Sequence, residues 1–213
     1  MTFPLPRPRR PLEGPLAPPR PGGRAHQEEL RRWYVAELGW GEVFLDARGG
    51  APAALRTGVR FDVLRLPVEA GLMLLRELRP GGPVALGGGA MRFLVAAGGA
   101  EELPGLLDWL DWGALVPELT AVGAGGRIEA PVPWSGGRPG GAGAQDPGRD
   151  GPQGAASWLR PPEQGAGSES GLPGPVAVRG GGAPSLVRLV DAAASCCLRV
   201  RLRRAGVQPL AFS

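Results

Sequence analysis

The chain of 213 residues contains no lysine, a single histidine and only two cysteines, the adjacent Cys196 and Cys197. A disulfide framework or a structural zinc site needs such residues at several separated positions, so the sequence offers neither. One histidine, His26, also disfavours Ser/His/Asp and Cys/His arrangements and therefore acyl-transfer enzymes. The glycine-rich segment 86–90 lacks the Gly-Lys-Ser/Thr of a phosphate-binding loop. We therefore expect no cofactor and no resident metal ion.

Long apolar runs are also missing. No stretch approaches the roughly 18 consecutive apolar residues of a membrane-spanning helix. The first residues alternate proline with arginine and lack the apolar centre of a secretory signal. These patterns predict a cytoplasmic protein without a membrane partner.

Charge alone says little about function. All 24 basic residues are arginines, and they face 20 acidic residues, for a net charge of +4. Arginine, alanine, glycine and proline dominate as they do in proteins of very GC-rich genomes, so the arginine content does not by itself indicate a ligand. Much of the positive charge lies in the first 24 residues, where it would give at most weak, salt-sensitive binding to nucleic acid.

Glycine and proline divide the chain into folded and unfolded parts. The 37 glycines and 25 prolines concentrate in 1–24 and 135–184. We expect a disordered Pro/Arg-rich tail over 1–24, one folded domain over 25–204 and a C-terminal tail over 205–213. Within the domain, 135–184 should be mostly a flexible insertion with an ordered island at 155–162.

Hydrophobic periodicity predicts an α/β domain of α+β type, with a mixed, largely antiparallel central sheet and helices packed against it. The expected helices are 25–39, 67–79, 100–113 and 186–204. The expected strands are 41–47, 55–67, 82–86, 90–97, 117–122 and 126–131. Glycines 87–89 should join two of these strands as a hairpin. In helix 67–79 the predicted buried stripe is Val68, Gly71, Leu72, Leu75 and Leu78.

Four segments stand in a characteristic order: LRTGVRFDVLRLPVEAG, GGPVALGGGAMRFLV, GAGGRIEAPVPW and GAASWLRPP. This order resembles that of the bifunctional DNA primase/polymerase N-terminal domain, the Prim-Pol branch of the archaeo-eukaryotic primase superfamily. It is most similar to the short, actinobacterial-type versions of that domain, and the similarity covers about residues 30–162. The series as a whole is more specific than any one segment.

The resemblance implies that this chain occupies the place of a two-metal site, but that residues at all three of the family's metal-site motifs are replaced. Active members carry a carboxylate pair after a strand, a histidine in a Gly-Gly-x-His turn and a third carboxylate before a Gly-x-Gly-Gly turn, because two Mg²⁺ ions need hard oxygen ligands. Here the first site offers only Asp62, with Arg65 where an acid is expected. Met91 takes the histidine position and Thr120 the third. Leu64, Leu66, Met91 and Thr120 would then line an apolar or basic cleft.

A catalytically degenerate primase/polymerase-like domain is therefore the leading hypothesis, without primase or polymerase activity. It would retain weak nucleic-acid or nucleotide binding through arginines, for which the candidates are Arg56, Arg60, Arg65, Arg92 and Arg127.

Two alternatives remain open. The first is a protein–protein interaction module with no nucleic-acid role, which would use Trp109 and Trp112 or the Pro-rich tail. The second is an active metal-dependent nucleotidyltransferase whose carboxylates have moved, built from Asp62 with Glu118 or Glu129.

Overall fold

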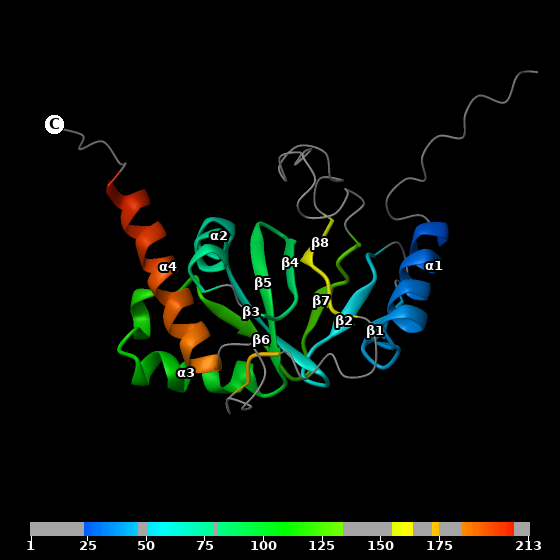
Figure 1. The fold of residues 1–213 in the computed structure, drawn as a ribbon, viewed down its shortest axis with the longest axis horizontal. Helices are drawn as coiled ribbons and strands as arrows, with labels where there is room; N and C mark the ends of the chain where they lie inside the picture. Colours follow the sequence, from blue (N-terminus) through cyan, green and yellow to red (C-terminus); the bar gives the residue numbers. More distant parts are fainter. Residues whose placement is uncertain are drawn as a thin grey trace, which may run out of the picture.

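The computed structural model describes residues 24–46, 51–78, 81–133, 155–163, 172–174 and 185–206. Within these residues the chain forms four α-helices and two antiparallel sheets (Figure 1), which confirms the predicted α/β class. The predicted tail 1–24, apart from Arg24, lies outside the described residues. So do most of the predicted insertion 135–184 and the chain after Gly206.

The smaller sheet has the order β1-β2-β7, with β1 at Phe44–Leu45, β2 at Ala54–Arg56 and β7 at Arg127–Glu129. The larger sheet has the order β6-β3-β5-β4-β8. Its strands are β6 Thr120–Val122, β3 Phe61–Pro67, β5 Ala90–Ala96, β4 Val84–Gly87 and β8 Ser157–Arg160. The predicted hairpin is confirmed, since β4 and β5 pair antiparallel around residues 87–90. β3 pairs with both β5 and β6 and so is an inner strand.

The predicted single strand over 55–67 is wrong, because a turn divides it into β2 and β3, which belong to different sheets. Gly58 makes the turn with a φ of +81°. A second corner, residues 123–126, carries the chain from β6 into β7. The corners are packed together, since the Thr57 hydroxyl donates to the Gly123 carbonyl at 2.6 Å and a Cβ on Gly58 would lie 2.2 Å from Cα of Ala124. The crossing from β2 to β3 and the crossing from β6 to β7 therefore meet at one place.

Three helices cover one face of the larger sheet (Figure 1): α2 at Val68–Glu77, α3 at Gly99–Trp109 and α4 at Leu186–Gly206. A short 3₁₀ helix, η2, follows α3 at Gly113–Leu115. The predicted terminal helix is confirmed, and Ser185 caps it by accepting the amide N–H of Arg188 at 3.4 Å. The side of α4 that packs on the sheet is apolar and buried, with Leu186, Leu189, Val190, Ala193, Cys197 and Val200.

The predicted stripe of the second helix is partly wrong. The buried residues of α2 are Ala70, Gly71 and Leu74, whereas Leu72 is 41% exposed. The helix lies directly on β5, since a Cβ on Gly71 would be 2.5 Å from the sulfur of Met91. This close approach at glycine turns Ala70 and Leu74 inward and Leu72 outward.

On the other face of the larger sheet a second core forms around Tyr34 and Trp158. Tyr34 belongs to a π-helical segment, η1 Trp33–Glu37, which continues α1 at Arg24–Arg32. Its hydroxyl donates to the Pro131 carbonyl at 2.7 Å and accepts from Nε1 of Trp158 at 2.9 Å. Trp158 lies on β8, within the segment 155–162, and is fully buried. Its packing holds β8 against β4.

Candidate anion-binding site

A row of paired residues crosses the larger sheet on the face that bears this second core. On the inner strand β3, Arg65 stands directly opposite Arg92 of β5 and, on its other side, opposite Thr120 of β6. Residues directly opposite each other on neighbouring strands point to the same face of a sheet. The fold therefore brings two guanidinium groups and a hydroxyl together from three separate strands.

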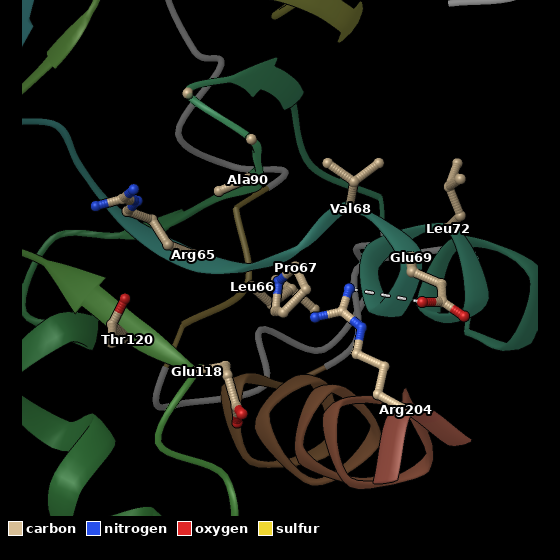
Figure 2. A pocket seen from close by; sticks show the side chains of 12 residues that line it. Arg65, Leu66, Pro67, Val68, Glu69, Leu72, Ala90, Glu118, Thr120 and Arg204 are labelled. Atoms are coloured by element: carbon tan, nitrogen blue, oxygen red, sulfur yellow. Dashed lines mark ion pairs between the residues drawn. The ribbon is translucent and has the colours of Figure 1, made fainter. Parts of the chain in front are cut away.

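An open pocket of about 670 Å³ lies beside this row. Pro67 and Ala90 are the next cross-strand pair on the same face, and both line it. The pocket forms where β3 ends and α2 begins, opposite the glycine turn between β4 and β5. Figure 2 shows Arg65 and Thr120 on one side of it and the ion pair of Glu69 with Arg204 on the other.

Arg92 is the most deeply buried charged group of the row. Its side chain is 8% exposed, and its Nε and Nη1 atoms have no hydrogen-bond partner among the residues that the structure describes. Burial lowers the pKa of Arg92 from its usual value, the neighbouring charge of Arg65 lowers it further, and Glu129 raises it. Nε of Arg65 is buried and without a partner in the same part of the chain. The row thus holds positive charge that the described residues do not fully pair.

Asp62 and Met91 do not belong to this row. Side chains alternate along a strand, so Asp62 points to the opposite face from Arg65 and Met91 to the opposite face from Arg92. Asp62 is fully buried, and its Oδ2 accepts the amide N–H of Ala100 at 3.0 Å in the first turn of α3. Asp62 therefore anchors a helix on the side away from the arginine pair.

The expected lining of the cleft by Leu64 and Met91 is wrong. Both side chains are buried in the core beneath the three helices, and Met91 packs against Gly71 of α2. Leu66 borders the pocket but is only 1% exposed. Arg92, one residue beyond the position assigned to the family's histidine, is the residue that faces Arg65. The sequence predicted Arg92 as a phosphate contact but not this pairing, because the pairing depends on the register between β3 and β5, which α2 and β4 separate along the chain.

The other candidate arginines lie on the smaller sheet or near it. Arg56 of β2 and Arg127 of β7 are exposed and stand opposite each other. Glu129, two residues after Arg127, points to the same side of β7 and acts electrostatically on Arg92. Arg60 is ion-paired with Glu42 at 2.9 Å, so a phosphate would have to compete with that carboxylate.

The carboxylates of the relocated-metal hypothesis do not share one site. Glu118 lines the pocket, Oε1 of Glu129 accepts the amide N–H of Ala156 at 3.2 Å, and Asp62 faces the helices. Among the described residues, no three His, Cys, Asp or Glu side chains are grouped to hold a metal ion.

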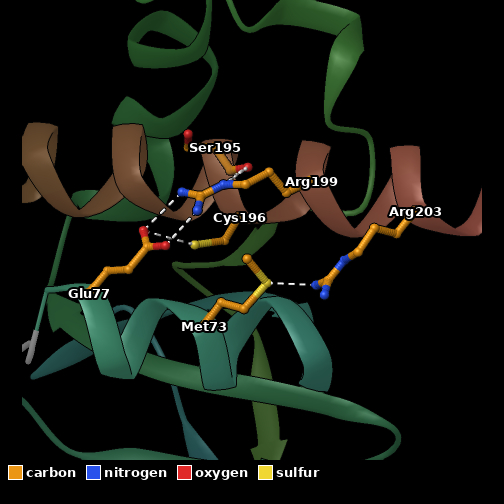
Figure 3. A network of polar contacts seen from close by, with 6 residues as sticks. All are labelled: Met73, Glu77, Ser195, Cys196, Arg199 and Arg203. Carbon is orange, nitrogen blue, oxygen red and sulfur yellow. Dashed lines mark hydrogen bonds and ion pairs between the residues drawn. The ribbon is translucent and has the colours of Figure 1, made fainter.

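A second polar cluster joins α2 to α4 away from the pocket row (Figure 3). Arg199 donates to both carboxylate oxygens of Glu77, at 2.6 and 2.9 Å, and Sγ of Cys196 lies 3.6 Å from the same group. Burial raises the pKa of Cys196 to about 11 and that of Cys197 to about 12. Thiols with such pKa values contain little thiolate near neutral pH, so this cluster holds helices together and is not a nucleophilic site.

The two tryptophans of the interaction hypothesis differ in exposure. Trp109 ends α3 and is 71% exposed. Trp112 is half-buried and donates from Nε1 to Asp191 of α4 at 2.9 Å. Trp112 therefore ties the chain after α3 to α4, which leaves Trp109 as the exposed aromatic surface.

Comparisons of the chain with protein-family models, with curated proteins and with solved structures find no match. In the described part of the chain, no helix has the length and apolar character required to cross a membrane.

Proposed function

We propose that this chain is a catalytically inactive primase/polymerase-like domain that binds nucleic acid through arginine side chains. The observation that supports this function best is the row of Arg65, Arg92 and Thr120 on one face of the larger sheet. In the family that the motif order resembles, carboxylates bind two Mg²⁺ ions. Guanidinium groups at that place repel metal ions and attract the phosphates that the metal ions would otherwise hold.

The proposed binding surface extends from this row to the smaller sheet. Arg56 and Arg127 form an exposed pair, so their guanidinium groups are accessible to a phosphate backbone. Contacts of this kind give affinity without reading sequence, and each contact contributes to the salt dependence of binding. We expect weak, sequence-tolerant binding of single strands.

Fluorescence anisotropy with a labelled single-stranded oligonucleotide tests this proposal. The double variant Arg56→Gln/Arg127→Gln should bind more weakly than the wild type, and the slope of log affinity against log salt should fall by about 1.4 if two phosphate contacts are lost. A matched control is Arg188→Gln, which removes an exposed arginine from the start of α4. Binding that ignores salt, or that both variants weaken equally, would remove the support for this surface.

A primer-extension assay tests the inactive state. With Mg²⁺ or Mn²⁺ and all four deoxynucleotides, we expect no extension and no de novo primer. The proposal would be contradicted if the homogeneous protein showed metal-dependent extension activity and the Arg65→Ala variant lacked that activity.

The exposed Trp109 favours a second candidate, a protein-interaction surface at the end of α3. Size-exclusion chromatography with light scattering should then show self-association or a complex in cell extract, and Trp109→Ser should abolish it. A strict monomer that stays unchanged in extract would argue against this candidate.

A further inference from the structure

The arginine row of Arg65 and Arg92 differs from an exposed phosphate contact, because its guanidinium groups are partly or largely buried. Arg92 is 8% exposed and has two nitrogen atoms without a hydrogen-bond partner in the described part of the chain. Arg65, directly opposite on β3, has one such nitrogen atom, Nε. Taking guanidinium groups out of water without pairing them is strongly unfavourable, and a nearby anion would offset this cost. These three nitrogen atoms are themselves closed to solvent, so an anion in the pocket would contact other nitrogen atoms of the two guanidinium groups.

The glycine turn leaves Arg92 close to the pocket. A Cβ on Gly88 would lie 3.5 Å from Nη2 of Arg92, and one on Gly87 would lie 3.0 Å from Nη1. Gly88 and Gly89 line the pocket. Arg65 lines the pocket from β3, whereas Arg92 lies outside the lining and approaches it at Gly88, which carries no side chain.

Other donors surround the same space. α2, a helix of ten residues, begins at Val68 beside the pocket, and its N-cap residue Pro67 makes no side-chain cap. The N-cap side chain therefore does not accept from the first amide groups of α2, and free amide groups at a helix N-terminus favour an anion. The hydroxyl of Thr120 lies on the opposite side of the pocket from α2 (Figure 2).

The two carboxylates at the pocket leave room for an anion near the turn. Glu69 is ion-paired with Arg203 at 3.1 Å and with Arg204 at 3.6 Å. Glu118 lies across the pocket from Ala90 (Figure 2). Glu69 is therefore already paired, and the carboxylate that acts electrostatically on Arg92 is Glu129, which compensates part of its charge.

We propose that Arg65 and Arg92 bind the phosphate group of a phosphomonoester and that they do so without a divalent cation. The proposal rests on the proposed function in taking a nucleotide as the ligand, and it adds a defined subsite and the independence from metal. A pocket of about 670 Å³ exceeds a phosphate ion and has room for an attached nucleoside. Two planar guanidinium groups supply both the charge and the paired hydrogen bonds that a phosphate takes.

Isothermal titration calorimetry with the full chain in EDTA tests this. The probes are adenosine monophosphate, inorganic phosphate and adenosine, together with one oligonucleotide carrying either a 5′-phosphate or a 5′-hydroxyl. Adenosine monophosphate and phosphate should bind in EDTA, and adenosine should not. Arg65→Gln should weaken the binding of adenosine monophosphate at least about tenfold, as expected when a charge-assisted hydrogen bond is lost.

The controls separate this subsite from the general surface. Arg188→Gln removes the same charge from the start of α4, sixteen residues before Arg204, and should leave the affinity unchanged. Because replacing the buried Arg92 risks unfolding, Arg65→Gln carries the test, with circular dichroism to verify its fold. Tighter binding of the 5′-phosphorylated strand than of the mononucleotide would identify a strand end as the source of the phosphate, and the reverse would identify a free nucleotide.

Each failure has a separate meaning. If the two oligonucleotides bind equally and neither phosphate nor adenosine monophosphate binds, the subsite is wrong while nucleic-acid binding stands. If adenosine monophosphate binds and oligonucleotides do not, the subsite stands and the proposed nucleic-acid function is wrong. A requirement for Mg²⁺ in any phosphate binding would overturn the metal-free arrangement.

Discussion

The corner at Gly58 gives the sharpest test of the architecture, because the crossing from β2 to β3 and the crossing from β6 to β7 meet there. Gly58→Ala places a methyl group 2.2 Å from Cα and 2.8 Å from N of Ala124, which are backbone atoms that cannot move without shifting the 123–126 corner. The φ of +81° adds a second cost, because a left-handed conformation is unfavourable for alanine by about 1–2 kcal/mol. Overpacking of this kind costs about 1–3 kcal/mol more.

The variant should therefore lose about 3 kcal/mol of unfolding free energy, which corresponds to a fall of about 6–12 °C in Tm for a chain of this size. Urea and thermal unfolding, followed by tryptophan fluorescence and circular dichroism, measure both quantities. Gly89→Ala is the matched control, since Gly89 has a φ of +70° and no atom within 4 Å of the position that the alanine methyl group would occupy. The control should lose only the conformational part, about 1–2 kcal/mol. Equal losses in the two variants would refute the close packing of the two corners.

Three further outcomes are expected. Asp62→Ala removes the acceptor for the first turn of α3 and should lower the unfolding free energy by about 1–2 kcal/mol in urea melts. Asp62→Asn keeps an acceptor and should lower the unfolding free energy less, so equal effects of the two variants would contradict the anchoring role. With pKa values of about 11 and about 12, Cys196 and Cys197 should resist Ellman's reagent at pH 8 until denaturant is added, and rapid labelling of the native chain would contradict their burial. Hydrogen bonds from Arg199 lower the pKa of Glu77. The wild type should therefore be more stable than Glu77→Gln at neutral pH, and this difference should disappear as the pH falls through the lowered pKa. A stability difference that persists in acid would exclude the ion pair as its source.

Local signals predicted the elements that a short stretch of sequence can specify. The three glycines at 87–89 permit the positive φ angles of a tight turn, found at +60° for Gly88 and +70° for Gly89, so the hairpin was evident. The last helix was evident as well, because one face of α4 packs on the core while its other face carries polar residues. In both cases the information lies within about twenty residues.

Other predictions were wrong because the strands concerned are covered on both sides. Nearly every residue of β3 and of β5 is buried, so neither FDVLRLP nor AMRFLVA shows the alternation that reveals which side chains share a face. Without that alternation, Arg65, Asp62 and Met91 could all be placed in one cleft. The division of 55–67 between two sheets was hidden for a similar reason, since its apolar residues serve two different cores.

The amino-acid sequence by itself determined the class of fold, the hairpin and the closing helix. Only the tertiary structure decided that Arg65 meets Arg92 and Thr120 while Asp62 and Met91 face the helices. The physical reason is that strand register and the choice of sheet face depend on contacts between segments far apart in the chain, and a one-residue difference in position moves a side chain to the opposite face.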